Sequence, residues 1–352
     1  YKAADILQER MVDLSDILMR EVAKDRKSAE SEINRTADFI RFTADTSKSI
    51  YGESIQSDSF PGFDKKKLSI VVREPIGVVL AISPFNYPIN LSASKIAPAL
   101  VAGNTVVLKP ATKGSLCGLY LAKIFQEAGI PDGVLNTVTG RGNEIGDYIV
   151  THPSIDFINF TGSSEVGMRI SKLTNMVPLL MELGGKDAAI VLEDADLKLA
   201  AKNIVEGAYS YSGQRCTAVK RVLVEENIAD KLVEEIKVLV KDLKVGNPTE
   251  EGVSIVPLID EKAADFVWDL IEDARNKGAH LILGAKREKN IIYPTLFDYV
   301  TSDMRLAWEE PFGPVLPIIR VKDKDEALRI ANESQYGLQS SVFTNNLDNA
   351  FY

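Results

Sequence analysis

Short apolar runs that alternate with longer helical windows constrain the fold of this chain more than any other feature. The first five runs occupy positions 78–82, 105–108, 135–138, 157–160 and 188–192. They are mostly apolar on both faces, as strands are when helices cover both sides of a sheet. A repeated strand, helix, strand order requires right-handed crossovers and gives a parallel sheet. Further runs follow at positions 219–224, 281–283, 315–321 and 340–343. The sequence therefore predicts an α/β fold.

The glycine pair Gly184-Gly185 divides these runs into two comparable halves. We expect two doubly wound parallel-sheet (Rossmann-like) domains, since 352 residues can bury two cores. One domain takes residues 1–52 and 75–183, and the other takes residues 184–352. Residues 53–74, rich in Ser, Gly, Pro and charge, predict a small hairpin insertion. Helical spacing of apolar residues in the first 50 positions predicts two surface helices.

Charge and apolar length exclude several classes of protein. With 41 Lys+Arg against 50 Asp+Glu the net charge is −9, so the chain is a poor binder of nucleic acid phosphates. Its longest apolar stretch, 76–85, is far shorter than the roughly 20 residues of a membrane span, and the start lacks the basic and apolar regions of a secretory signal. We expect a cytoplasmic protein with no membrane and no nucleic acid partner.

Scarce cysteine and histidine exclude a metal centre built on them. The two Cys are 117 and 216, and the two His are 152 and 280, so no zinc-ligand spacing can be assembled and no metal is expected. The chain starts at Tyr1 and stops inside a helical pattern at Tyr352, from which we also expect a piece of a longer protein.

Two glycine-rich turns and one lysine occupy places where parallel sheets bind ligands. Positions 140–146 and 160–167 follow strands and open helices, where free amides can hold a pyrophosphate, although the glycines alone can equally serve as plain turns. Lys109 ends a predicted strand. It either binds a phosphate or ribose at that edge of the sheet, or it points into solvent. Thr112, just beyond, can simply cap the next helix.

Three further residues have both a chemical and a structural interpretation. Cys216 has small and polar neighbours and the charge of Arg215 beside it, which favours a reactive thiol, whereas Cys117 reads as helix packing. Glu182 ends an apolar strand and is either a desolvated base with a raised pKa or a salt-bridge partner. Asn86 either donates to an oxyanion or forms a turn beside proline.

Taken together, six segments occur in the order found in one enzyme family. They are Pro84-Phe85-Asn86-Tyr87-Pro88, Lys109-Pro110, Phe160-Thr161-Gly162-Ser163, Glu182-Leu183-Gly184-Gly185-Lys186, Gly213-Gln214-Arg215-Cys216 and Glu310-Pro311-Phe312-Gly313-Pro314. Along its whole length the chain resembles the aldehyde dehydrogenase superfamily. Positions 82–90, 140–148 and 211–221 resemble most closely its non-phosphorylating, NADP-dependent glyceraldehyde-3-phosphate dehydrogenases.

The resemblance implies oxidation of glyceraldehyde 3-phosphate to 3-phosphoglycerate with NADP. It makes Cys216 the nucleophile that forms a thiohemiacetal and then a thioester, Asn86 an oxyanion donor, and Glu182 the base that activates the hydrolytic water. It also implies an NADP-binding domain before Gly184, a partial oligomerisation hairpin at 53–74, a C-terminally incomplete catalytic domain, and a homodimer or homotetramer.

The same resemblance assigns residues to cofactor and substrate. The cofactor residues are Ser83, Lys109, Thr112, Asp147, Gly162, Ser163 and Glu310. The substrate residues are Arg35, Asn86, Tyr87, Arg215, Cys216 and Thr217. A Lys/Thr pair suits a 2′-phosphate, which favours NADP over NAD, and arginine forks suit the substrate phosphate. Two alternatives stay open, namely another aldehyde dehydrogenase such as a semialdehyde dehydrogenase, and a catalytically silent binding protein.

Overall fold

The protein divides into two compact units. The computed structural model describes residues 1–57, 61–62 and 67–352. Unit 1 contains Tyr1–Ile17 and Glu30–Glu182, and unit 2 contains Leu18–Ala29 and Leu183–Tyr352. The boundary after Glu182 lies beside the glycine pair that divides the predicted strands. The sequence expectation keeps residues 1–52 together, whereas in the structure Leu18–Ala29 packs with unit 2.

Three helices, not two, form the start of the chain. They are α1 (Lys2–Glu9), α2 (Met11–Val22) and α3 (Arg26–Ser47). The expectation of two surface helices is wrong in number because a single residue, Arg10, separates α1 from α2 without disturbing the apolar spacing. The helices bury their apolar faces, on which Leu7, Leu14 and Ile33 are fully buried.

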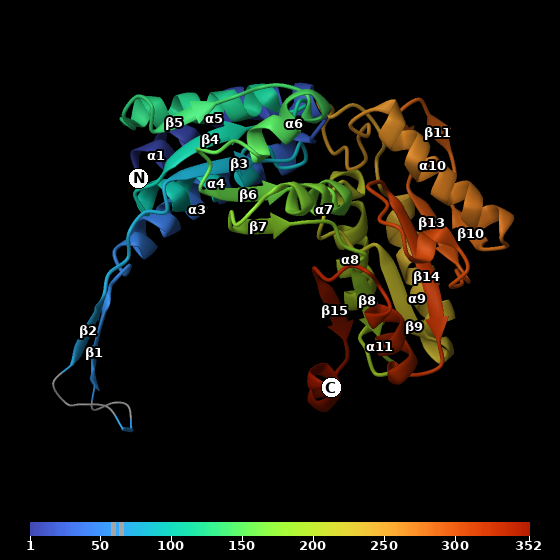
Figure 1. Ribbon diagram of the computed structural model, residues 1–352. Helices are drawn as coiled ribbons and strands as arrows, with labels where there is room; N and C mark the ends of the chain where they lie inside the picture. Colours follow the sequence, from blue (N-terminus) through green and yellow to red (C-terminus); the bar gives the residue numbers. More distant parts are fainter. Residues whose placement is uncertain (58–60, 63–66) are drawn as a thin grey trace. The chain divides into compact units, whose positions relative to one another are not determined.

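A five-stranded parallel sheet forms the centre of unit 1, in the order β5-β4-β3-β6-β7. The strands are β3 (Val78–Ile82), β4 (Thr105–Lys109), β5 (Leu135–Thr137), β6 (Phe157–Thr161) and β7 (Leu179–Glu182). The helices between them are α4 (Asn90–Val101), α5 (Ser115–Ala128), α6 (Gly142–Val150) and α7 (Ser164–Leu173) (Figure 1). Right-handed crossovers place α4 and α5 on one face and α6 and α7 on the other. The chain therefore changes direction at β3, which makes a topological switch point beside β6.

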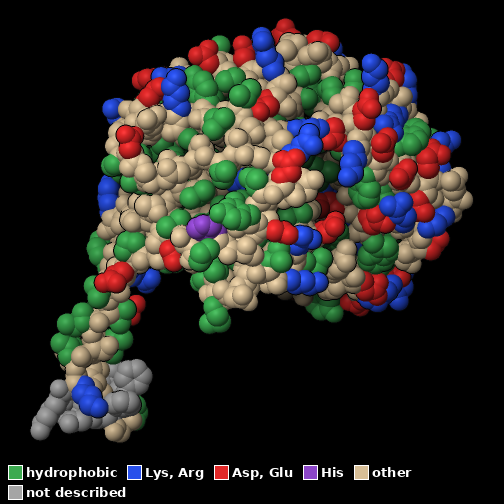
Figure 2. All heavy atoms as spheres, turned by 45° about the horizontal axis from the view of Figure 1, so that its top comes forward, with side chains coloured by type: hydrophobic (Ala, Val, Ile, Leu, Met, Phe, Trp, Pro, Cys, Tyr) green, Lys and Arg blue, Asp and Glu red, His purple; other side chains and the backbone are tan. Residues whose placement is uncertain are grey.

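A two-stranded antiparallel hairpin interrupts unit 1 before its sheet. Strand β1 (Glu53–Gln56) pairs with β2 (Leu68–Val71), with Glu53 opposite Val71. The expected insertion at 53–74 includes positions 58–60 and 63–66, which lie outside the described residues. Hydrophobic side chains are visible along the hairpin in Figure 2, and Leu68, Ile70 and Val72 are each at least 60% exposed.

Unit 2 contains a six-stranded sheet in the order β10-β13-β14-β9-β8-β15, parallel except for β10. Its strands are β8 (Ala188–Val191), β9 (Arg221–Glu225), β10 (His280–Leu283), β13 (Thr295–Asp298), β14 (Val315–Val321) and β15 (Ser340–Phe343), and a small pair joins β11 (Arg287–Glu288) to β12 (Ile291–Ile292). Its helices are α8 (Leu197–Tyr209), α9 (Glu226–Lys241), α10 (Glu261–Asn276), α11 (Lys324–Asn332) and α12 (Leu347–Phe351).

Alternate residues of β8 point into two separate cores. Ala188 and Ile190 join a cluster with α10, whereas Ala189 and Val191 join a second cluster with α8 and α9. Apolar side chains are thus buried on both faces of the strand, which explains why its sequence shows no polar alternation. The doubly wound α/β prediction is confirmed. The strand β13 was not among the runs found in the sequence.

Acidic and basic side chains mix over the face seen in Figure 2, without a large patch of one sign. No helix in the described part of the chain combines the length and the apolar character needed to cross a bilayer.

Candidate active site

The carboxyl ends of four strands of unit 1 bring predicted site residues into one row. Ile82 pairs with both Lys109 and Phe160, and Thr161 pairs with Glu182. The Ser83 amide donates to the Lys109 carbonyl at 3.2 Å, and the Gly162 amide donates to the Glu182 carbonyl at 3.2 Å. Ser83, Lys109, Gly162 and Glu182 therefore lie along one edge of the sheet, at the switch point where such folds bind ligands.

Lys109 is the last residue of β4, and Thr112 follows three positions later. Lys109 is 7% exposed, its ammonium donates to the Pro110 carbonyl at 3.3 Å, and burial lowers its pKa. The Thr112 hydroxyl donates to the Gly140 carbonyl at 3.3 Å, which ties it to the glycine turn before α6. A buried cation that has no carboxylate partner among the described residues is a suitable neighbour for an anionic ligand, because the anion restores its charged form.

Ser163 and Asp147 belong to the two helices on the other face. Ser163 is the N-cap of α7, where its hydroxyl accepts from the Val166 amide. Asp147, on α6, is exposed and paired with Arg169 of α7, and these hydrogen bonds lower the pKa of the Asp147 carboxyl. Asp147 thus joins α6 to α7 in this structure.

Glu182 is held by two residues that the sequence analysis missed. The ammonium of Lys95, which is 1% exposed on α4, donates to Glu182 Oε2 at 3.1 Å, and the Thr161 hydroxyl donates to the same oxygen at 2.5 Å. Burial pushes the pKa of Glu182 upward, but the Thr161 bond and the Lys95 charge outweigh it, so the pKa lies below its ordinary value. Of the two interpretations of Glu182, the salt-bridge partner describes this structure. The raised pKa is wrong.

Asn86 and Tyr87 occupy the turn between β3 and α4, where Asn86 is 3% exposed. The turn is fixed from α3, because Glu32 Oε1 accepts from the amides of Ile89 and Asn90 at 2.9 and 3.0 Å. Arg35 is exposed on α3, three residues after Glu32 and therefore on the same side of that helix. Unit 1 thus brings the helix of Arg35 against the turn of Tyr87.

In unit 2 the polar groups of the site lie at the amino ends of the strands, whereas in unit 1 they lie at the carboxyl ends. Asp187 directly precedes β8, Lys220 precedes β9, and Gln339 precedes β15. The Lys220 amide donates to the Asp187 carbonyl at 2.9 Å, and the Gln339 amide donates to Asp187 Oδ1 at 3.3 Å. Desolvation raises the pKa of Asp187 to about 6.

A left-handed turn delivers Cys216 to this edge. Tyr211, Ser212 and Gly213 all have positive φ, at 50°, 54° and 70°. A side chain at Gly213 would come within 2.4 Å of the Gly313 carbonyl oxygen, so glycine is required there. Ser212, fully buried, donates its hydroxyl to the Val256 carbonyl and accepts from the Val256 amide, at 2.9 and 2.7 Å. These bonds hold two non-glycine residues in a conformation they rarely adopt.

Cys216 is partly exposed, whereas Cys117 is fully buried in α5, as its sequence surroundings predict. Burial raises the pKa of the Cys216 thiol, and the charge of Lys220 and the backbone amide of Thr217 oppose that effect. The Cys216 surroundings therefore contain the two features that stabilise thiolates, a cation and a backbone donor.

Glu310 lies beside the same group. Its carboxylate accepts from the Lys220 ammonium and from the Gly185 amide, the latter at 3.3 Å. A side chain at Gly184 would come within 1.9 Å of Glu310 Oε2, so the glycine pair leaves room for this carboxylate. Gly184 is therefore needed for close packing against Glu310.

Arg215 retains an unused donor. Its Nη2 donates to the Gly207 carbonyl at 2.9 Å, but its Nε is buried without a hydrogen-bond partner among the described residues. A buried guanidinium N–H without an acceptor is costly unless a ligand supplies one, and phosphate oxygens suit it.

The structure thus assembles the predicted residues in two groups. Unit 1 gathers Asn86, Tyr87, Lys109 and Glu182 near the edge of one sheet, and unit 2 gathers Cys216, Thr217, Arg215 and Glu310 near the edge of another. The sequence analysis missed Lys95, Thr161, Asp187 and Lys220 as parts of these groups. Lys95 had a visible signal, since it is the one charged residue in α4.

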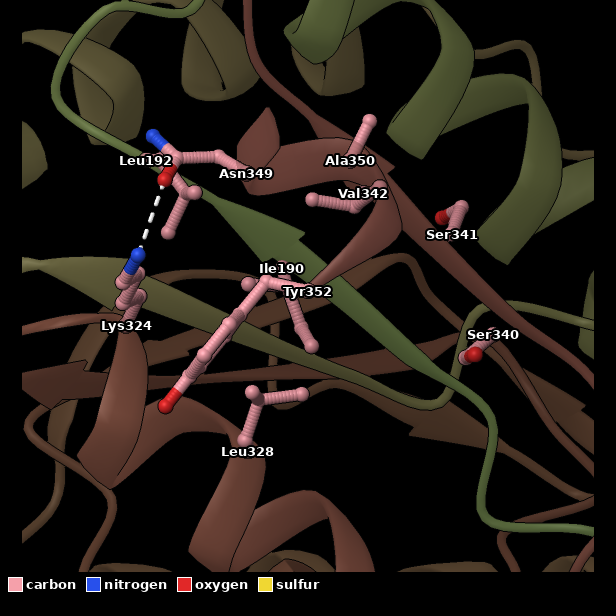
Figure 3. A pocket seen from close by; sticks show the side chains of 10 residues that line it. All are labelled: Ile190, Leu192, Lys324, Leu328, Ser340, Ser341, Val342, Asn349, Ala350 and Tyr352. Atoms are coloured by element: carbon pink, nitrogen blue, oxygen red, sulfur yellow. Dashed lines mark hydrogen bonds between the residues drawn. The ribbon is translucent and has the colours of Figure 1, made fainter. Parts of the chain in front are cut away.

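A cavity of about 220 Å³ lies elsewhere in unit 2, between β8, β15, α11 and α12 (Figure 3). In this view Lys324 donates to Asn349, beside the ring of Tyr352. None of the predicted site residues lines it.

Comparison with known proteins bears on both units. The model described as "Aldehyde dehydrogenase family" matches residues 1–352. An NADP-dependent glyceraldehyde-3-phosphate dehydrogenase of Streptococcus equinus is 60% identical over 351 residues, which are 100% of this chain and 74% of that protein. The enzyme of the same name from Pisum sativum is 50% identical over 352 residues. The matched region is 99% of this chain and 71% of the Pisum sativum protein.

Solved structures give the same result. The NADP-dependent glyceraldehyde-3-phosphate dehydrogenase from Bacillus halodurans, complexed with NADP, superposes with a TM-score of 0.98 at 57% identity, covering 100% of this chain and 74% of that one. An NAD-dependent aldehyde dehydrogenase from Sinorhizobium meliloti gives a TM-score of 0.95 at 37% identity, covering 99% and 70%.

Proposed function

Because this chain belongs to the aldehyde dehydrogenase family, we propose that it oxidises glyceraldehyde 3-phosphate to 3-phosphoglycerate with reduction of NADP. The similarity to the streptococcal enzyme, 60% identical across the chain, carries the choice of substrate and cofactor. The position of Cys216 beside the Lys220 charge and the Thr217 amide supports the chemistry.

In the proposed mechanism Cys216, as thiolate, attacks the aldehyde carbon and forms a thiohemiacetal. The side-chain amide of Asn86 and the backbone N–H of Cys216 donate to the oxyanion, each worth about 3 kcal/mol in comparable sites. When bound, NADP would supply the hydride acceptor that converts the thiohemiacetal into a thioester. Glu182 then removes a proton from water, the water oxygen bonds to the thioester carbon and the C–S bond breaks, which releases the acid and returns the Cys216 thiolate.

The residues at the carboxyl edge of unit 1 fit NADP. Buried Lys109 and the Thr112 hydroxyl lie beyond β4 and suit the 2′-phosphate, with Ser83, Gly162 and Ser163 along the same edge. Asp147 lines the cleft from α6, and Glu310 binds the nicotinamide ribose. Unit 1 is accordingly the cofactor domain, and unit 2 supplies the nucleophile.

For the substrate phosphate we propose Arg35, Tyr87 and Arg215, with Thr217 beside the nucleophile. The unused Nε donor of Arg215 supports this, because a phosphate oxygen would satisfy it. The same arginine donors would also bind the carboxylate of a carboxylated aldehyde. Comparing the oxidation rates of phosphorylated and carboxylated aldehydes therefore decides between these two substrate classes.

The test is a steady-state assay of the protein with glyceraldehyde 3-phosphate, comparing NADP with NAD and adding inorganic phosphate in one arm. We expect NADPH formation that is independent of phosphate, a higher kcat/KM than with succinic semialdehyde, and none with Cys216→Ser. Preference for the semialdehyde, activity that needs phosphate, or full activity in Cys216→Ser would overturn the proposal.

We also propose that the chain forms a homo-oligomer in the cytoplasm, through the hairpin β1-β2. The exposed Leu68, Ile70 and Val72 support this, since exposed apolar strands seek partners. Light scattering after gel filtration measures the mass. A monomer at micromolar concentration, or equal masses for the native hairpin and the triple variant Leu68→Lys/Ile70→Lys/Val72→Lys, would contradict it, and fractionation of cells checks the compartment.

A further inference from the structure

Lys220 is a buried lysine whose ammonium contacts several groups. It is 1% exposed and directly precedes β9, where its backbone amide donates to the Asp187 carbonyl. Its Nζ donates to the Cys216 carbonyl at 2.8 Å and to the Glu310 carboxylate, and lies 5.3 Å from the centre of the Phe312 ring. The side chain therefore joins the backbone of the cysteine to the carboxylate of Glu310.

The bond to the Cys216 carbonyl has a geometric consequence at the sulfur. That carbonyl and the amide N–H of Thr217 belong to one peptide group, which is planar and trans, so they point in opposite directions. When Lys220 holds the carbonyl on one side, the Thr217 N–H is turned to the other side, and this backbone donor lowers the pKa of the Cys216 thiol. One ammonium thereby orients a donor that it does not touch.

We propose that Lys220 is a positioning residue, which fixes the Cys216–Thr217 peptide in the orientation that stabilises the thiolate and links that peptide to Glu310. The inference rests on the proposed role of Cys216 as nucleophile. It adds a route by which a ligand on Glu310 affects the thiol. A ligand hydroxyl that hydrogen-bonds to the Glu310 carboxylate weakens the ion pair between Glu310 and Lys220. The Lys220 ammonium then interacts more strongly with the Cys216 carbonyl.

The charges around the thiol act in opposing directions. Lys220 favours the thiolate, and Glu310 and Asp187 disfavour it, while burial is the largest influence and favours the neutral thiol. Lys186 also lies in this group, where the charges of Arg221, Lys220, Glu310 and Glu309 act on it. Removing Lys220 and neutralising Glu310 should therefore shift the titration of Cys216 in opposite directions, whereas a merely structural role predicts no such opposition.

The experiment measures alkylation of Cys216 by iodoacetamide as a function of pH, without aldehyde or cofactor, with peptide mass spectrometry to separate Cys216 from buried Cys117. For Lys220→Met we expect the midpoint of the profile to rise by about one pH unit. The rate at pH 7 should fall only about threefold, because the more basic thiolate is a better nucleophile. Glu310→Gln should lower the midpoint, and Lys220→Arg should restore part of the loss.

Two variants keep the test decisive. Lys220→Met leaves Glu310 without its buried partner and can unfold the protein, so the same lysine is also removed in the Glu310→Gln background, where residue 310 no longer carries a charge that needs this partner. In the double variant, the midpoint of the Cys216 alkylation profile should lie at a higher pH than in Glu310→Gln. Lys237→Met, which removes a cation paired with Glu234 on its own helix, is the control and should not shift the profile.

Equal midpoints for Glu310→Gln and the double variant, or shifts of the same sign for Lys220→Met and Glu310→Gln, would overturn the proposal. Because the readout is alkylation, these outcomes are separate from a failure to form NADPH, which bears on the proposed function alone.

Discussion

Lys95 donates to Glu182 at 3.1 Å from a fully enclosed position on α4, whereas the carboxylate at the end of β7 is itself 47% exposed. Although burial pushes the pKa of Glu182 upward, the Thr161 hydrogen bond and the Lys95 charge favour its charged form, and its pKa lies below the ordinary value. At neutral pH the proposed base is ionised and ready to take a proton from water.

Thr161→Val should raise the pKa of Glu182, because it removes one of the two donors to Oε2. The acid limb of the pH profile for thioester hydrolysis should move upward by about 0.5 to 1 pH unit. Thr161→Ser, which keeps the hydroxyl, should leave the limb in place. Profiles of single-turnover hydrolysis for the two variants check this, and identical limbs would contradict it.

The same bonds affect folding. The pKa of Glu182 is lower in the folded than in the unfolded protein, so its contribution to stability is present above the ordinary pKa and is lost as pH falls through the folded value.

Asp187→Asn should remove a pH dependence of stability. The folded pKa of Asp187 is raised to about 6 from 3.8, so its favourable contribution is complete below about pH 4 and is lost as pH rises through about 6. Asparagine keeps the acceptor for the Gln339 amide. Relative to wild type, the variant should gain about 1–2 kcal/mol between pH 4 and pH 7, with allowance for solvent screening. Urea unfolding at several pH values measures it, and a constant difference would refute it.

Gly184→Ala should displace the Glu310 carboxylate, since its Cβ would come within 1.9 Å of Oε2. We expect a loss of at least tenfold in kcat/KM for NADP and about 1–3 kcal/mol of stability. Gly146→Ala is the matched control: it lies within α6, with no atom within 4 Å of the new Cβ, and should stabilise the protein by about 0.5–1 kcal/mol. Steady-state kinetics and thermal unfolding compare the two, and equal behaviour would argue against the packing described.

Ser212→Ala should cost about 2–3 kcal/mol, because it leaves both buried backbone groups of Val256 without their partner. Ser212→Gly loses the same bonds but relieves the left-handed conformation, and should cost about 1 kcal/mol less. Denaturant titration gives both values. A larger loss for glycine than for alanine would show that the φ of this residue is not strained.

The parallel sheets follow from the sequence because alternating apolar runs leave few other folds, and all nine runs found in this way are strands. The strand β13 escapes notice because its buried segment, Thr295–Asp298, contains two polar residues whose partners come from distant positions. The break at Arg10 and the packing of Leu18–Ala29 in unit 2 escape for a similar reason, since tertiary contacts decide them.

For the site, sequence motifs name the residues that bear the chemistry but not the residues that tune them. Glu182 and Cys216 are visible in their segments, whereas Lys220 resembles an ordinary surface lysine until its burial is known, and Lys95 is marked only as the one charged residue in α4. The sign of the pKa shift of Glu182 depends on Thr161 and Lys95, which explains why the local sequence leaves both interpretations of Glu182 open.

The packing of Leu18–Ala29 in unit 2 has a consequence for the way the chain folds. The Tyr211 hydroxyl donates to the Val22 carbonyl across 189 positions, and the Lys24 ammonium lies 4.6 Å from the centre of the same ring. During synthesis this early segment emerges long before its partners, and joining it to them closes a long loop. Unit 2 should therefore reach its native state late, after most of the chain has left the ribosome, and the turn that delivers the cysteine should be among the last parts to become ordered.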